Sequence, residues 1–279
     1  MVPLLAMPYV ARQVRKAGRP KPGGYVIARQ YEKDVARAFR FTASRLLTDA
    51  EVARLARAIS ASDMAAAMKF VPMVAGEDGG DYRDMLKTLQ KNYKAIMAAS
   101  GRKALTSLDI GLAFDMKNPD AIDWMKRRSL SLIKDMSKET KAAVRDLLTS
   151  GLVKGTPVDK TAALIRPLIG LDAVSAGAAM KRLALHMGDP DMSPDRAHEL
   201  AERYAEQLLD NRAERIARTE TIAAEAEGRL QAWGQAQEEG LMGDNPTKRW
   251  HSSTEDNGGC EHCAPLDLVD VPLNDDFST

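Results

Sequence analysis

Apolar residues recur at helical spacing along almost the whole chain between Gly24 and Gly240, and this pattern constrains the fold more than any other feature. Hydrophobic residues make up 44% of the 279 residues but aromatic residues only 5%, so Ala, Leu, Ile, Val and 14 Met supply the apolar content. Strands of sandwiches and barrels favour β-branched and aromatic side chains. We therefore expect a mainly α fold, with multi-helix N-terminal and central regions and a small C-terminal strand-and-turn module.

Composition also excludes several classes of protein. Charged residues reach 28%, mean hydropathy is −0.33, and no apolar run approaches the ~20 residues that span a bilayer. The apolar stretch from Met1 to Val10 precedes the first basic residues, which is the reverse of a secretory signal. Two cysteines cannot make a disulfide framework. A membrane protein, a secreted mini-protein and a collagen-like rod are excluded.

Composition and turn signals divide the chain into four parts. Residues 1–24 form a basic flexible arm, and residues 25–150 form an N-terminal helical region. Residues 151–240 form a second helical domain, which ends in a long helix. Residues 241–279 form a small α+β module with a Cys-x-x-Cys pair.

Caps and glycines predict where individual helices begin and end. Thr48 and Glu51 have the spacing of a capping box, which starts a helix that ends near Ser60. Gly101 is expected to stop a helix that covers roughly 81–99. Ser137 is expected to restart a helix after the one that Asn118-Pro119 opens.

Charge is distributed unevenly although the net charge is only +1. Residues 1–45 carry ten Lys or Arg and two acids, whereas residues 250–279 carry seven acids and no Lys or Arg. The basic residues of the arm that lie among Gly and Pro are Arg12, Arg15, Lys16, Arg19 and Lys21. This pattern indicates an anionic partner for the arm, or simply a solvated terminus.

A polar motif lies in the region 194–239, which reads as one long helix or as two joined near Asp210 and which Gly240 is expected to end. By helical spacing, Arg212, Arg215 and Thr219 fall along one stripe, with Arg218 beside it. Ile216 and Ala217 can face a core. Arg218 and Glu220 are too far apart in angle to pair with each other, so each needs a partner elsewhere. An ordinary solvated helix face is the alternative.

A second motif follows Trp250. Cys260 and Cys263 can hold two corners of a tetrahedral zinc site, and His251 is the best local candidate for a third; His262 and Asp256 are weaker. A metal-free pair of buried thiols is an equal alternative. A redox role is disfavoured because the acidic surroundings raise thiol pKa.

Several catalytic motifs are absent from the sequence. The chain has no glycine-rich phosphate loop and no Gly-x-Ser-x-Gly elbow. His198-Glu199 begins like a zinc-protease helix, but Glu202 occupies the position of the second His. With four histidines in all, the sequence disfavours an enzyme.

Taken together, the two motifs resemble the phage head morphogenesis family, which includes the Mu F-like and the SPP1 portal-associated minor head proteins. The resemblance covers residues 212–277 and is looser from about residue 151. The helical part matches at Ile216, Ala217, Arg218, Thr219 and Glu220, and the C-terminal part matches at Trp250, Asp256, Cys260 and Cys263. Between these two parts, residues 228–233 have the order Gly-Arg-x-x-Ala-Trp, which also belongs to the resemblance. Relatives often continue with further His and Cys residues, whereas this chain ends at Thr279. A truncated module and an incomplete zinc half-site both remain open.

The resemblance implies a non-enzymatic minor capsid protein of a tailed phage or phage-like particle. Such a protein acts in the host cytoplasm during assembly and then lies inside the head near the portal. Its expected partners are the portal protein, other capsid or scaffolding proteins, and double-stranded DNA. Arg218 and Glu220 are expected to anchor the long helix to the terminal module, and the basic arm to bind DNA or the portal. A zinc-knuckle nucleic-acid-binding protein and a hydrolase or transferase that uses Glu220 are the alternatives.

Overall fold

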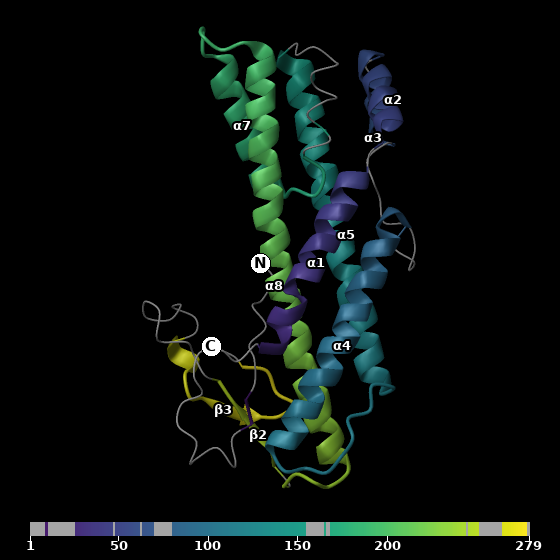
Figure 1. Cartoon of the computed structure of the whole chain (residues 1–279), viewed down its shortest axis with the longest axis vertical. Helices are drawn as coiled ribbons and strands as arrows, with labels where there is room; N and C mark the ends of the chain where they lie inside the picture. Colours follow the sequence, from purple (N-terminus) through teal and green to yellow (C-terminus); the bar gives the residue numbers. More distant parts are fainter. Residues whose placement is uncertain are drawn as a thin grey trace. The chain divides into compact units, whose positions relative to one another are not determined.

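A computed structural model describes most of the chain, and its helices follow one another with few strands between them (Figure 1). The described residues are 9–10, 26–46, 48–61, 63–69, 80–154, 165, 168–243, 245–250 and 264–277. The described α-helices are α1 (Val26–Arg45), α2 (Asp49–Ser60), α3 (Met64–Met68), α4 (Arg83–Ser107), α5 (Pro119–Lys154), α7 (Ala173–Met187) and α8 (Pro194–Glu238). Short 3-10 turns cover Gly80–Tyr82 and Ala264–Leu266. The expectation of a mainly helical protein is confirmed.

A small antiparallel sheet brings the two end regions of the chain together. Its strands are β1 (Tyr9–Val10), β2 (Thr247–Arg249) and β3 (Asp270–Pro272), with β2 in the centre. In β1, Tyr9 lies opposite Arg249, and in β3, Pro272 lies opposite Thr247. Residues 9–10 therefore form a strand, although they were expected in a flexible arm, because β2 offers them a backbone edge to pair with.

Side-chain caps start the helices where the sequence places them. The Thr48 hydroxyl accepts a hydrogen bond from the amide of Glu51 (3.3 Å), and the Glu51 carboxylate accepts one from the amide of Thr48 (2.7 Å). This confirms the capping box at the start of α2. The Asn118 side chain likewise accepts from the amide of Asp120 (2.9 Å) at the start of α5.

Two predicted helix boundaries are wrong. Gly101 does not stop α4, which continues to Ser107. A Cβ atom at Gly101 would lie 2.3 Å from the Phe114 ring, so glycine is needed there for packing and not as a stop. Ser137 does not restart a helix, because α5 runs without interruption from Pro119 to Lys154 and Ser137 is buried within it.

The long C-terminal helix is a single element. Helix α8 continues through Asp210 and ends just before Gly240, which has a φ of +68°. Beyond the end, the amide of Leu241 donates to the carbonyl of Ala236 (2.9 Å). A left-handed glycine with this backbone bond is the usual way to satisfy the last carbonyls of a helix, so the predicted stop at Gly240 is confirmed.

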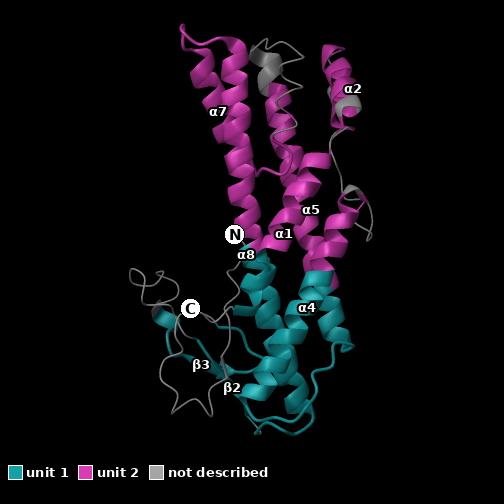
Figure 2. Ribbon diagram, viewed as in Figure 1, with its two compact units in different colours: residues 1–32, 91–125, 218–279 teal, residues 33–90, 126–217 magenta. Residues whose placement is uncertain are grey.

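The chain forms two compact units, and each is assembled from separated segments (Figure 2). Unit 1 contains residues 1–32, 91–125 and 218–279, and unit 2 contains residues 33–90 and 126–217. This grouping differs from the expected contiguous regions 25–150 and 151–240. The physical reason is that each unit buries apolar faces of helices that are distant in the sequence, and a cut along the sequence separates such partners.

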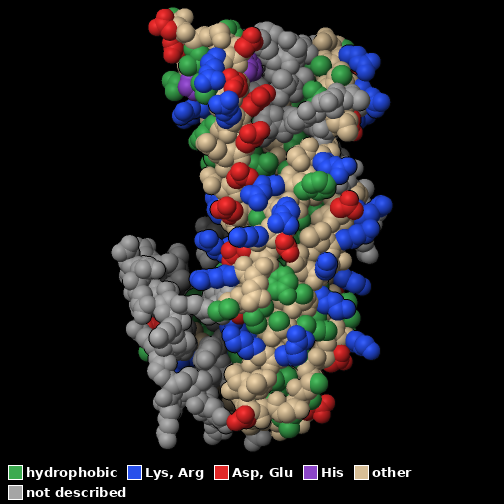
Figure 3. Space-filling view, viewed as in Figure 1, with side chains coloured by type: hydrophobic (Ala, Val, Ile, Leu, Met, Phe, Trp, Pro, Cys, Tyr) green, Lys and Arg blue, Asp and Glu red, His purple; other side chains and the backbone are tan. Residues whose placement is uncertain are grey.

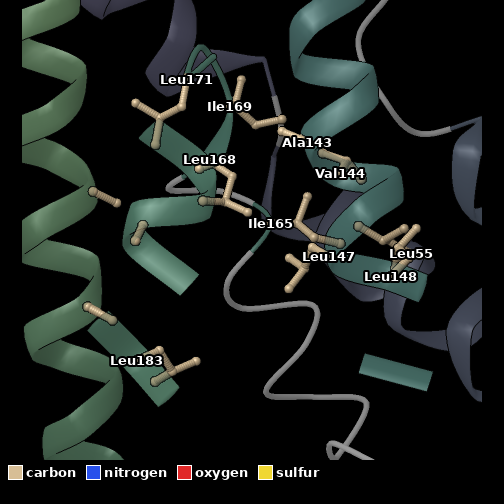
Figure 4. Packing of buried hydrophobic residues seen from close by; sticks show 14 of the residues in the cluster. Leu55, Ala143, Val144, Leu147, Leu148, Ile165, Leu168, Ile169, Leu171 and Leu183 are labelled. Atoms are coloured by element: carbon tan, nitrogen blue, oxygen red, sulfur yellow. The ribbon is translucent and has the colours of Figure 1, made fainter. Parts of the chain in front are cut away.

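Unit 2 has an aliphatic core. Leu147 and Leu148 of α5 pack with Leu55 of α2 and with Ile165 (Figure 4). Leu183 of α7 belongs to the same cluster, together with the small side chains Ala197, Ala201 and Ala205 of α8. Full burial of one leucine stabilises a fold by about 1.5–3 kcal/mol, so this cluster is a main source of the stability of unit 2.

Unit 1 packs α4 and α8 at very short range. A Cβ atom at Gly228 of α8 would lie 2.2 Å from the Ser100 hydroxyl and 2.6 Å from the Met97 backbone. Leu105 of α4 packs against Ala232 and Ala236 of α8. Small residues on α8 therefore allow the two helices to approach until their backbones nearly touch.

Candidate functional site

The polar motif of α8 divides into buried and exposed side chains. Arg212, Ala217, Glu220 and Thr221 are buried, and Ile216 is half-buried. Arg215, Arg218 and Thr219 are exposed. The inward direction of Ala217 agrees with the sequence analysis, whereas Arg212 lies on the buried side and not on a solvated stripe with Arg215. The motif supplies residues 212–217 to unit 2 and residues 218–221 to unit 1.

Arg212 joins three other helices within unit 2. Its guanidinium forms an ion pair with Glu139 of α5 and lies 3.9 Å from the carboxylate of Asp172, which precedes α7. The same group lies 6.0 Å from the centre of the Phe39 ring of α1. The side chain of Arg212 is only 8% exposed. A buried guanidinium is costly unless it is paired, so these contacts fix Arg212 as an internal brace.

Asp172 completes this arrangement at the start of α7. Its carboxylate accepts a hydrogen bond from the amide of Ser175 (2.7 Å) and lies 3.7 Å from Arg215. Partial burial by itself raises the pKa of Asp172. The hydrogen bonds from Ser175 and the charges of Arg212 and Arg215 outweigh that effect and hold this pKa below its usual value.

Glu220 performs the corresponding role in unit 1. Its carboxylate accepts a hydrogen bond of 2.6 Å from the hydroxyl of Tyr93 on α4, and both side chains are buried. The Tyr93 ring in turn contacts the Trp124 ring of α5, with 5.5 Å between the ring centres. Glu220 therefore ties α8 to α4, while a tie from Arg218 or Glu220 to the terminal module stays a prediction.

Glu225 is a second buried carboxylate that the sequence analysis missed. It is fully buried, accepts a hydrogen bond from the amide of Ala28 (2.8 Å), and pairs with Arg229 one turn later. Ala28 lies in the first turn of α1, which has no acidic residue of its own there. An acceptor with negative charge is stabilising at a helix N-terminus, so α8 supplies to α1 a cap from a distant part of the sequence.

Apolar side chains join the terminal module to the helices of unit 1. Leu273, which follows β3, is buried against Trp233 of α8 and Ala104 of α4. In the described part of the chain, apolar residues therefore connect the long helix to the C-terminal module, and the anchoring role expected of Arg218 and Glu220 stays a prediction. Trp233 belongs to the Gly-Arg-x-x-Ala-Trp part of the family resemblance, and that signal was available in the sequence.

The terminal module has polar contacts of its own. Arg249 and Asp270 form a two-bond ion pair across β2 and β3, with distances of 2.6 and 2.7 Å. The Trp250 ring, half-buried, packs edge-on against Phe277 with 5.4 Å between the ring centres. Burial lowers the pKa of Lys248, while the nearby acids Asp275, Asp276 and Glu227 act to raise it.

The remaining predicted site residues lie outside the described residues. They are Arg12, Arg15, Lys16, Arg19, Lys21, His251, Asp256, Cys260 and Cys263. Within the described ranges, no three His, Cys, Asp or Glu side chains are grouped so that they could hold a metal ion. The predicted zinc ligands and the predicted basic arm therefore stay predictions.

The geometry of the α8 motif suits a brace between helices. Glu220 and Glu225 are each engaged by a neighbouring helix, and Arg212 is engaged by two carboxylates. In comparisons with known proteins, no family model, curated protein or solved structure gives a significant match to this chain. In the described part of the chain, no helix combines the length and the apolar character needed to cross a membrane.

Proposed function

We propose that this chain is a minor capsid or head morphogenesis protein of a tailed phage or phage-like particle. In this role it binds the portal protein during head assembly, remains inside the head near the portal, and contacts packaged DNA. The proposal rests on the order of motifs from residue 212 to residue 277, which resembles that family. Portal binding needs rigid helices and no reaction centre.

The burial of the α8 motif is the structural observation that supports this proposal. Glu220 is 4% exposed and holds Tyr93, so its carboxylate braces two helices and is poorly placed to reach a substrate. Arg212 has a similar bracing role in unit 2. These roles favour a docking scaffold over a hydrolase or transferase that uses Glu220.

Zinc is part of the proposal for the terminal module. Cys260, Cys263 and His251 would supply two thiolates and an imidazole, a donor set that suits zinc in a structural site. The alternative function, a zinc-knuckle nucleic-acid-binding protein outside a virion, would depend on this metal. Elemental analysis of the purified full-length chain tests the metal, with bound zinc at one atom per chain as the result expected for a knuckle.

Co-expression with the portal protein of the same genome tests the proposed function. We expect the chain to elute with a ring-shaped portal oligomer in size-exclusion chromatography, and to do so equally with and without a chelator. An unrelated ring-shaped oligomer serves as the control. Elution of the chain by itself, or DNA binding that a chelator abolishes, would favour the zinc-knuckle alternative instead.

A further inference from the structure

Helix α5 carries a stripe of positive side chains within unit 2. The five residues of this stripe, which we call the α5 stripe, are Arg127, Lys134, Lys138, Lys141 and Arg145. Four of them are exposed and Lys141 is half-exposed. At 100° per residue they fall within about 60° of the helix circumference, and they extend over about 27 Å of helix.

The acidic residues of α5 within unit 2 lie on another side of the helix. Asp135, Glu139 and Asp146 are displaced from the stripe by roughly a third of a turn. Glu139 is already paired with Arg212. The side chains of Lys134, Lys138 and Arg145 have no ion-pair or hydrogen-bond partner among the described residues. In the described part of the chain, these three charges of the stripe are therefore not neutralised.

The spacing of the stripe works against helix stability. Lys134 and Lys138 are four residues apart, as are Lys141 and Arg145. Like charges at this spacing repel one another on a helix surface. A helix face that served only to stay in water could alternate the signs of its charges, so the repulsion favours a role in binding an anion.

The surroundings of the stripe favour a nucleic acid over a protein partner. In the described part of the chain, no large exposed hydrophobic residue lies on α5. Protein interfaces depend on buried apolar and aromatic anchors, whereas binding to a nucleic-acid backbone depends on Lys and Arg. Binding of a single strand also uses exposed aromatic rings, and the aromatic residue of α5, Trp124, packs against Tyr93.

Positive charge also extends to a neighbouring helix. Figure 3 shows many Lys and Arg side chains on this face of the helices, in each unit taken by itself. Helix α4 contains six Lys or Arg and one acid, Asp84. The Lys and Arg residues of α4 are divided between the two units. All five residues of the α5 stripe, in contrast, belong to unit 2.

We propose that the α5 stripe binds the phosphate backbone of double-stranded DNA without sequence preference. This inference deepens the proposed function and rests on it only for the setting, a particle that holds DNA. Each Lys or Arg that neutralises a phosphate releases condensed counterions, so binding must weaken as the salt concentration rises. The stripe matches the length of roughly eight base pairs of duplex.

The test uses the full-length chain and a fluorescently labelled duplex of mixed sequence. The triple variant Lys134→Gln, Lys138→Gln, Arg145→Gln removes the three unpaired charges and keeps good helix formers. We expect it to bind the duplex at least about tenfold more weakly, and the slope of log K against log salt to fall by about 2.7. Its melting temperature should be equal to or above that of the parent chain, because like-charge repulsion is relieved.

A matched control removes the same charge from three other helices of unit 2. Lys33→Gln, Arg54→Gln and Lys181→Gln together change exposed residues of α1, α2 and α7. Equal weakening by this control, or an unchanged slope in the stripe variant, would overturn the proposal. Competition by polyglutamate as effective as competition by unlabelled duplex would assign the stripe to an acidic protein instead. Retained portal binding by the stripe variant separates this proposal from the proposed function.

Discussion

Single residues of α8 hold neighbouring helices through buried polar contacts. Arg212, Glu220 and Glu225 are buried, and each has a partner on another element. The net gain from such a contact is modest, but the loss of one partner leaves a charged group desolvated. The effect of a substitution on the free energy of unfolding therefore depends on whether it leaves a buried charged group without its partner.

The contact between Tyr93 and Glu220 can be measured by a double-mutant cycle. Tyr93→Phe removes the donor and leaves a buried carboxylate with one bond fewer, so we expect a loss of about 1–3 kcal/mol in the free energy of unfolding. Glu220→Gln should also lower it, and the coupling between the two should be about 0.5–3 kcal/mol. Tyr31→Phe, at a half-exposed tyrosine of α1, is the control. Unchanged denaturant unfolding of Glu220→Gln would contradict the bracing role.

Asp172 predicts a pH dependence of stability. Because its pKa is lower in the folded than in the unfolded chain, its charge stabilises the fold above the unfolded pKa of about 3.9, and this stabilisation is lost as pH falls through the folded pKa. Asp172→Asn keeps a good N-cap but removes the charge. At neutral pH, the free energy of unfolding of the parent chain should exceed that of this variant by about 0.5–1 kcal/mol.

The difference in the free energy of unfolding between the parent chain and Asp172→Asn should shrink towards zero below about pH 4. Urea titrations of both chains from neutral to acidic pH measure it. Ser193→Asn, at the start of α8, changes a cap without changing charge and should give a pH-independent difference. A difference between parent and Asp172→Asn that stays constant down to the most acidic pH would refute the assignment.

At the scale of elements, the crossing of α4 and α8 depends on the absence of one side chain. The Cβ position of Gly228 is occupied by the backbone of Met97, which cannot rotate out of the way. Gly234 lies on the same helix, and its Cβ position meets no atom within 4 Å. The two glycines therefore predict opposite effects of the same substitution.

Gly228→Ala should lower the free energy of unfolding by about 1–3 kcal/mol, because the helices must move apart. Gly234→Ala should raise it by about 0.4–1 kcal/mol, because alanine restricts the unfolded chain. Thermal and urea unfolding of both variants gives the comparison. A stabilised Gly228→Ala chain would show that α4 and α8 do not approach as closely as described.

At the scale of the whole molecule, the terminal module is held to the helices of unit 1 by an apolar contact. Leu273 is 3% exposed beside Trp233, whereas Leu268 in the same module is 51% exposed. Since the polar motif residues were expected to make this connection, the two leucines provide a direct check on which kind of contact fastens the module.

Leu273→Ala should cost about 2–4 kcal/mol of unfolding free energy, because it removes buried methyl groups and leaves a cavity. Leu268→Ala should change it by less than about 0.5 kcal/mol. Limited proteolysis should also cut the module faster in Leu273→Ala. Equal free energies of unfolding for the two variants would show that Leu273 does not fasten the terminal module to the helices of unit 1.

Local signals in the sequence determined several of the helix ends of this protein. The capping box at Thr48, the start at Pro119 and the stop at Gly240 are where the sequence predicts them. The inward direction of Ala217 also follows from helical periodicity. Caps and periodicity act within a few residues of each other, so one stretch of sequence contains all the information they need.

Only the tertiary structure decided which residues contact the buried polar side chains of α8. Tyr93 is 127 residues from Glu220, and Ala28 is 197 residues from Glu225, so no local pattern indicates these pairs. The same holds for Gly101, which looked like a stop and instead makes room for Phe114. A helix boundary depends mostly on neighbouring residues, whereas burial depends on which distant helix covers a given face.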